Sequence, residues 1–227
     1  AVSNGISWFF KNEPEGIILE DDCLPVNSFF KYCDVMLDKF RDDTSIWSIG
    51  GTKFKCYPYS NSRLGYKSEM FFCWGWASWR NRWDFFTRDV EALSNINHWS
   101  SWASSAHWLR VLDKLRYKKI DTWDYYFALM GIKRQSLSVV PPTNLVQNIG
   151  FSQDSTHTRK APRTYTNDVS VIDVSLRSGL VEVSSYDHIW YMLNSDHLFL
   201  RWTCIAGMNL MYMYEKMYKK ITHQVSK

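Results

Sequence analysis

Short apolar runs alternate along this chain with longer segments whose apolar side chains recur at helical spacing. The runs at 16–19 and 45–49 are continuous and brief, which is typical of buried strands, and the first is typical of a parallel sheet. Residues 1–11 and 25–40 place their apolar side chains along one side of a helix. This alternation of strands and helices predicts an α/β layered domain.

The later chain continues the pattern and then changes near Thr166. Up to that point the expected elements are loop-like residues 52–70, an aromatic segment at 71–83, mostly helical residues 89–117, a short helix at 123–130, a strand at 136–140 and a polar loop at about 150–168. Beyond it we expect a strand at 169–174 and one or two helices over 186–220. The sequence therefore predicts two units, residues 1–165 and 166–227.

The composition narrows the class of protein. At 227 residues and 45% hydrophobic side chains, the chain can bury a large core and is too apolar for a disordered tail. A net charge of +4, evenly spread, gives no argument for nucleic acid as a partner. The 12 Trp, 13 Tyr and 13 Phe favour flat apolar surfaces, as found in cores, sugar platforms and membrane interfaces.

The cysteines and the apolar runs indicate where the protein works. Five Cys without a C-x-x-C pair argue against a disulfide framework or a Cys-type zinc site, and for a reducing, cytoplasmic compartment. No signal-peptide pattern opens the chain, and Arg201 and Asn209 interrupt the longest apolar stretch, 198–214. The Met- and Tyr-rich segment 202–220 either covers the preceding domain or makes peripheral contact with the cytoplasmic face of the membrane.

Three consecutive acids, Glu20, Asp21 and Asp22, follow the first predicted strand. Like charges at the end of a buried strand repel one another and resist desolvation, and a divalent cation relieves both costs because it binds carboxylate oxygens. In open α/β sheets, ligands also bind at the carboxyl ends of strands. The alternative is a solvated acidic turn in which Asp22 caps the next helix.

Five strings, in a consistent order over roughly residues 1–160, resemble one family. They are AVSNGISWFF at 1–10, EGIILEDDCLP at 15–25, WGWASW at 74–79, DTWDY at 121–125, and NLVQNIGF followed by THT within 144–158. Together they resemble GT-A glycosyltransferases, in particular the bacterial nucleotide-diphospho-sugar transferases often labelled hemolytic-protein-like. The resemblance implies a GT-A-like, Rossmann-related mixed sheet flanked by helices. It makes 1–165 a catalytic domain that lacks its N-terminal nucleotide-binding strands, and 166–227 a C-terminal strand and helical extension.

The resemblance also implies a metal site for Mn²⁺ or Mg²⁺. Asp22 is the direct ligand, while Glu20 and Asp21 hold the ribose of the donor, or the metal through water. His157 supplies a further ligand, although a lone loop histidine is otherwise a solvent-facing residue. Arg159 contacts the diphosphate, and its alternative is an ordinary solvated cation.

An inverting transfer needs a base that deprotonates the acceptor hydroxyl, and a carboxylate within hydrogen-bond reach serves. Asp124 is the first candidate for this base and Asp121 the second. The alternative is that Asp121 or Thr122 caps a helix whose first turn holds Asp124.

The string WGWASW offers a sugar platform. Indole faces stack on the C–H faces of sugars, and Gly75 lets the backbone approach a ligand closely. We expect Trp74, Gly75 and Trp76 to line the donor-sugar site and Trp79 to lie in the core. The alternative is that all of these rings are ordinary core aromatics.

The leading hypothesis is a metal-dependent, hexosyltransferase-like glycosyltransferase of bacterial surface polysaccharide biosynthesis. It moves a sugar from a nucleotide-diphospho-sugar donor to a glycan or lipid-linked acceptor. One alternative is a non-catalytic carbohydrate- or partner-binding remnant of such an enzyme. Another is a metal-dependent hydrolase that uses the acidic triplet.

Overall fold

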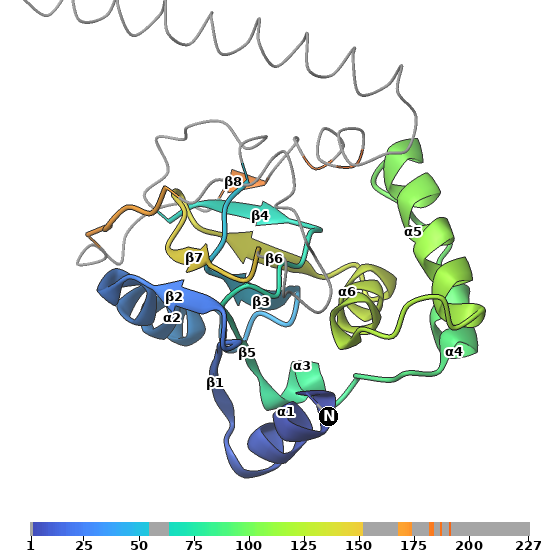
Figure 1. The fold of residues 1–227 in the computed structure, drawn as a ribbon, viewed down its shortest axis with the longest axis horizontal. Coiled ribbons are helices and arrows are strands. Elements are labelled where there is room, and N and C mark those ends of the chain that lie inside the picture. The colour runs from blue at the N-terminus through green and yellow to red at the C-terminus, as the bar shows by residue number, and fades with distance from the viewer. Residues whose placement is uncertain are drawn as a thin grey trace, which may run out of the picture.

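The computed structural model describes residues 2–54, 64–151, 168–173, 182–183, 187 and 191. Within these ranges the chain is a mixed α/β protein (Figure 1). The helices are α1 Val2–Asn12, α2 Asn27–Phe40, α3 Arg80–Trp83, α4 Val90–Ser94, α5 Trp102–Arg116 and α6 Trp123–Lys133. The strands are β1 Glu15–Ile18, β2 Cys23–Pro25, β3 Ile46–Gly50, β4 Tyr66–Ser68, β5 Trp76–Trp79, β6 Leu137–Val140, β7 Val146–Asn148 and β8 Glu182–Val183.

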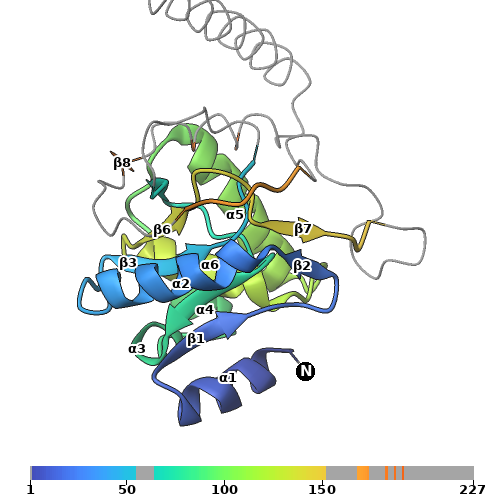
Figure 2. The ribbon, with the colours of Figure 1, turned by 90° about the vertical axis from the view of Figure 1, so that its left-hand side faces the viewer.

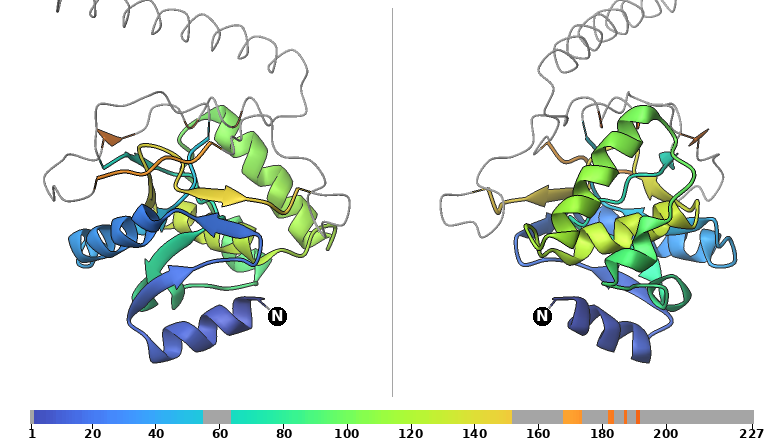
Figure 3. Two further views of the ribbon diagram at one scale, coloured as in Figure 1. Left: turned by 60° about the vertical axis from the view of Figure 1, so that its left-hand side comes forward. Right: turned by 90° about the vertical axis from the view of Figure 1, so that its right-hand side faces the viewer.

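The main sheet is mixed, with strand order β1-β5-β3-β6-β4-β8. Among the described strands, the pairs β3–β6 and β4–β8 are parallel, while β1–β5, β3–β5 and β4–β6 are antiparallel. The expectation that the first strand belongs to a parallel sheet is wrong, because β1 lies at the edge and pairs antiparallel with β5. A separate two-stranded sheet joins β2 to β7, and the two strands lie side by side in the left view of Figure 3.

Two hydrophobic clusters occupy the two faces of the main sheet. On one face α2 packs its apolar side chains, among them Phe29, Tyr32 and Met36, against β1, β3 and β5 (Figure 2). The other face carries the aromatic cluster, in which Trp47 Nε1 donates to the Phe127 carbonyl of α6 at 3.1 Å. Gly131 on α6 makes this contact possible, because a Cβ there would lie 2.8 Å from the Trp47 ring.

Most of the predicted elements are confirmed. The helices expected at 1–11, 25–40 and 123–130 and the strands expected at 16–19, 45–49 and 136–140 are all present within a few residues. Residues 89–117 are mostly helical, as α4 and α5. The predicted loop 52–70 contains the missed strand β4, whose three residues are too few to show a pattern.

The strand expected at 169–174 is wrong for its described part, 169–173, which forms no strand. These residues instead make single hydrogen bonds to other parts of the chain. Ser170 N donates to the Asn144 carbonyl, and Ile172 N donates to Ser28 Oγ. In so short a segment, alternating apolar and polar residues indicate packing of one side of the chain against the domain as readily as they indicate a paired strand.

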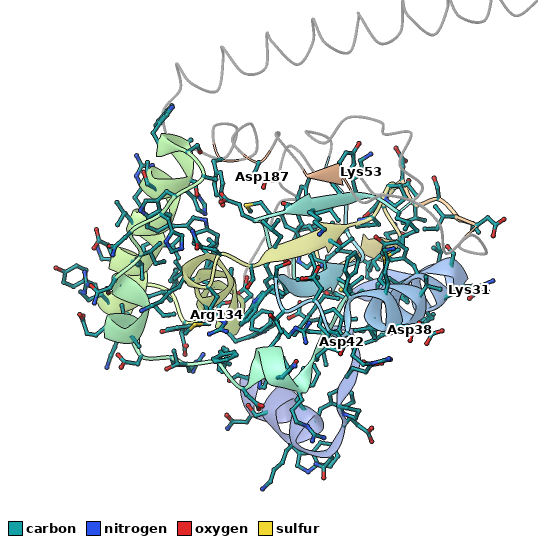
Figure 4. The ribbon with its side chains drawn as sticks, turned by 180° about the vertical axis from the view of Figure 1, so that it is seen from behind. Lys31, Asp38, Asp42, Lys53, Arg134 and Asp187 are labelled. Carbon is teal, nitrogen blue, oxygen red and sulfur yellow. The ribbon has the colours of Figure 1, made fainter. Side chains whose placement is uncertain are left out.

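The predicted helices over 186–220 lie outside the described residues, apart from Asp187 and Tyr191. The Asp187 carboxylate accepts from Ser68 Oγ at 2.7 Å and from Glu69 N at 2.8 Å, and Trp108 Nε1 donates to Tyr191 Oη at 2.7 Å. Figure 4 shows Asp187 close to the sheet. None of the helices in the described part of the chain has both the length and the apolar character needed to cross a membrane.

Candidate functional site

The chain leaves β1 at its carboxyl end and turns through the predicted acidic triplet into β2. Backbone bonds fix this turn, because Cys23 N donates to the Glu20 carbonyl at 3.1 Å and Ile149 N donates to the Asp22 carbonyl at 2.8 Å. The second of these bonds continues the pairing of β2 with β7. The acids therefore follow an edge strand of the sheet and lie against the segment after β7.

Glu20 lies in a concentrated negative field. Its carboxyl group is partly buried and lies close to the Trp123 side chain, which favours its ionised form. Burial, followed by the charges of Asp22 and Asp124, raises the pKa of Glu20 to about 7 from its usual 4.5. The end of β1 and the start of α6 therefore share one electrostatic environment, although about one hundred residues separate them along the chain.

Asp124 stands in the first turn of α6, and both of its carboxylate oxygens are engaged. Thr122 Oγ1 donates to Oδ1, and the Cys73 thiol lies 3.9 Å from Oδ2. Burial together with the charges of Asp124 and Glu20 raises the pKa of Cys73 well above its usual range, so this thiol stays protonated. The Asp124 carboxylate is thereby held between α6 and the aromatic segment before β5.

The Asp22 side chain is held in a narrow space. Cys23 Sγ lies 3.5 Å from Asp22 Oδ1, and burial next to this carboxylate raises the pKa of Cys23 to about 12. Gly150 packs so closely that a Cβ at this position would overlap the Asp22 carboxylate. The backbone here is itself fixed, because Gly150 N donates to Asn148 Oδ1 at 2.8 Å.

Trp74 and Gly75 precede β5 and face the same region. The Trp74 ring is partly exposed and packs edge-to-face on Phe151, with ring centroids 5.3 Å apart. Gly75 has a φ of +69°, and a Cβ there would collide with Val146 of β7 and approach Leu19. Glycine is required at position 75 because the backbone of this turn is left-handed and packed tightly.

The structure corrects the expectation for Trp76. Its side chain is 0% exposed and stacks on Trp123 with ring centroids 5.5 Å apart, so it forms core and not an open sugar platform. In an antiparallel pair, successive side chains point to opposite faces, and this alternation turns Trp76 into the aromatic cluster. Trp79 lies in the core, as expected, on the α2 face of the sheet.

Two further predicted residues, Asp121 and Asp21, have exposed side chains. Asp121 is 81% exposed at its side chain and forms an ion pair with Arg88 at 2.9 Å. The Asp21 side chain is exposed on the turn. His157 and Arg159 lie outside the described residues.

Sequence reasoning gave no role to three residues that shape the site, namely Cys73, Trp123 and Gly150. All three stand within or directly beside the strings that carry the family resemblance. Their position in or beside these strings is the one sequence feature that could have indicated a role in the site. The residue type alone does not show which side chains a cysteine or a glycine contacts in the fold.

The donor atoms fit a hard divalent cation in their chemistry. Within the described part of the chain, no three His, Cys, Asp or Glu side chains already form a group that could hold a metal ion. Glu20, Asp22 and Asp124 nevertheless concentrate like charge in one place, and carboxylate oxygens are the ligands that Mn²⁺ and Mg²⁺ prefer. Asp22 and Glu20 are the residues that would hold such an ion.

Comparison with known proteins gives no family. No protein-family model matches the chain, and no curated protein resembles it at a significant level.

Proposed function

We propose that the protein is a metal-dependent, inverting glycosyltransferase. It would transfer a sugar from a nucleotide-diphospho-sugar to a hydroxyl group of a glycan or lipid-linked acceptor. One observation carries the proposal, namely that Glu20 and Asp22 at the end of β1 share an electrostatic environment with Asp124 at the start of α6. A transferase of this kind needs both parts together, a site for the diphosphate and a base for the acceptor.

Asp124 is the proposed base. The acceptor O–H gives its proton to the Asp124 carboxylate, the new C–O bond forms at the anomeric carbon, and the bond from that carbon to the diphosphate oxygen breaks. Thr122 and Cys73 donate to the two oxygens of Asp124 and so fix the direction in which it accepts a proton. Positioning of this sort lowers the entropic part of the barrier.

The other roles follow from position. When bound at Asp22 and Glu20, Mn²⁺ or Mg²⁺ supplies positive charge that stabilises the departing diphosphate. The partly exposed Trp74 ring is the surface on which a sugar C–H face would stack. A cytoplasmic location, with the acceptor at the inner face of the membrane, suits a donor made in the cytoplasm.

The test is a donor assay with matched variants. The protein is incubated with Mn²⁺, a panel of sugar nucleotides and a panel of glycan acceptors, and release of nucleoside diphosphate is measured. Asp22→Asn and Asp124→Asn should each reduce turnover at least about 100-fold, whereas Asp121→Asn should leave it within about twofold.

Other outcomes would identify the alternatives. Release of free sugar that needs no acceptor would indicate a hydrolase. Glycan binding that is unchanged by chelation of the metal and by Asp22→Asn, with no turnover of any donor, would indicate a carbohydrate-binding remnant.

A further inference from the structure

A pocket of about 330 Å³ lies between α1 and α3, at the amino end of β1. The candidate site described above follows the carboxyl end of the same strand. Figure 2 shows α1 beneath β1 and α3 at the start of that strand. The α1–α3 pocket is therefore separate from the acidic site, and the proposed chemistry makes no use of it.

The polar groups that line the α1–α3 pocket are mostly donors. Arg80 Nε donates to the Phe10 carbonyl at 2.6 Å, which fixes the guanidinium at the end of α1, and within the described chain its two terminal amino groups have no partner. Lys11 also lines the pocket, and its ammonium group has no partner among the described residues. Ser7 Oγ accepts from Trp83 Nε1 at 3.0 Å, so its own hydroxyl hydrogen can be donated.

Aromatic rings form the floor beneath these donors. Trp83 stacks on Phe86 with ring centroids 4.4 Å apart and on Phe10 with centroids 6.0 Å apart. A floor that excludes water lowers the local dielectric constant and so strengthens the attraction between a cation and an anion bound above it. One carboxylate, Asp84, also lines the pocket, and it forms no ion pair with Arg80 in the described structure.

A neighbouring hollow of about 380 Å³ provides the contrast. There Arg41 is already paired with Glu15 at 2.9 Å. All the donor nitrogens of Arg82 are also used, by acceptors on Phe40, Arg41, Asp43, Ile46 and Asn81. Arg80 and Asp84 line this hollow too, so the cation that distinguishes the α1–α3 pocket from it is Lys11.

We infer that the α1–α3 pocket binds the phosphate or carboxylate group of a sugar-sized ligand. Arg80, Lys11 and Ser7 donate to the oxyanion, and the volume leaves room for the group that carries it, since ligand pockets begin at about 300 Å³. The inference does not depend on the proposed transfer reaction.

The test measures the heat of binding for three probes at low ionic strength, namely glucose 6-phosphate, glucuronate and glucose. One or both of the anions should bind, which distinguishes a phosphate from a carboxylate as the natural group, and glucose should not. Lys11→Ala should weaken anion binding about tenfold, the usual worth of one charge-assisted hydrogen bond. Lys31→Ala is the control, because Lys31 is an exposed residue of α2, far from the pocket, and should leave binding unchanged (Figure 4).

Three results would overturn the inference. The first is equal binding of the anions by the Lys11→Ala variant and the unmodified protein. The second is equal binding of glucose and glucose 6-phosphate. The third is no binding of either anion at concentrations up to about 10 mM, because a specific site binds its ligand more tightly than that. Arg80→Gln should abolish binding, and if that variant does not fold, the Lys11→Ala result decides.

Discussion

At the scale of single residues, ionised Glu20 lowers the stability of the folded protein. A carboxyl group with a pKa of about 7 binds its proton more tightly in the folded chain than in the unfolded chain, where the pKa is near 4.5. Below about pH 4.5 both states are protonated. As the pH rises to about 7, the unfolded state loses its proton first, so this group lowers the free energy of unfolding, and the full cost persists above pH 7.

Glu20→Gln removes this cost. We expect the variant and the unmodified protein to have similar stability at pH 4.5, and the variant to be more stable at pH 8 by about 1–2 kcal/mol, allowing for solvent screening of a partly exposed group. Urea unfolding at the two pH values measures the difference. Parallel stability curves for the two proteins would show that Glu20 does not lie in the field described.

Gly150→Ala tests the close packing around Asp22. A methyl group would displace the Asp22 carboxylate, so Mn²⁺-dependent turnover should fall at least about tenfold, because small misplacements of reacting groups are costly. Gly5→Ala is the matched control, since a Cβ at Gly5 on α1 meets nothing within 4 Å. The control should keep its turnover and gain about 0.5–1 kcal/mol of stability from better helix propensity. Equal turnover in both variants would contradict the described position of Asp22.

At the scale of elements, the aromatic cluster between the sheet and α6 anchors the site. Trp76 stacks on Trp123, and the Trp123 side chain lies close enough to Glu20 to influence its pKa, so one side chain links the core to the acidic residues. The cluster also sets the position of Asp124, the next residue along α6. A substitution that disrupts this packing should therefore alter the acidic site and also lower the stability of the protein.

Trp76→Ala should destabilise the protein by about 3–5 kcal/mol, the usual cost of removing a large buried ring. Trp102→Ala is the comparison, because Trp102 on α5 is 60% exposed and its loss should change stability by less than about 0.5 kcal/mol. Chemical denaturation measures both values. If Trp76→Ala were as mild as Trp102→Ala and affected only ligand binding, the ring would be a surface platform after all.

The sequence predicted the positions of helices and strands better than it predicted which strands pair and in which direction. Periodicity located α1, α2 and α6 because each has enough residues to show a face. It could not reveal that β1 pairs antiparallel with β5, since an apolar run carries no information about direction. The sequence predicted Asp124 at the site by resemblance, but the proximity of Cys73 depends on folding of the whole chain.

At the scale of the whole molecule, the two ends of β1 differ in charge. Acidic side chains follow its carboxyl end, and the unpaired donors of the α1–α3 pocket lie beside its amino end. The proposed cation site and the proposed anion pocket therefore lie at opposite ends of this short strand. The central claim concerns the first of these regions, where the end of β1 and the start of α6 form one acidic site.

The most direct measurement of that claim is the pKa of Glu20, followed by NMR in protein labelled with ¹³C at glutamate. The account predicts a pKa of about 7 in the unmodified protein, a lower value in Asp124→Asn, and no change in Asp121→Asn. A Glu20 pKa near its usual 4.5, or one that does not respond to Asp124→Asn, would contradict it.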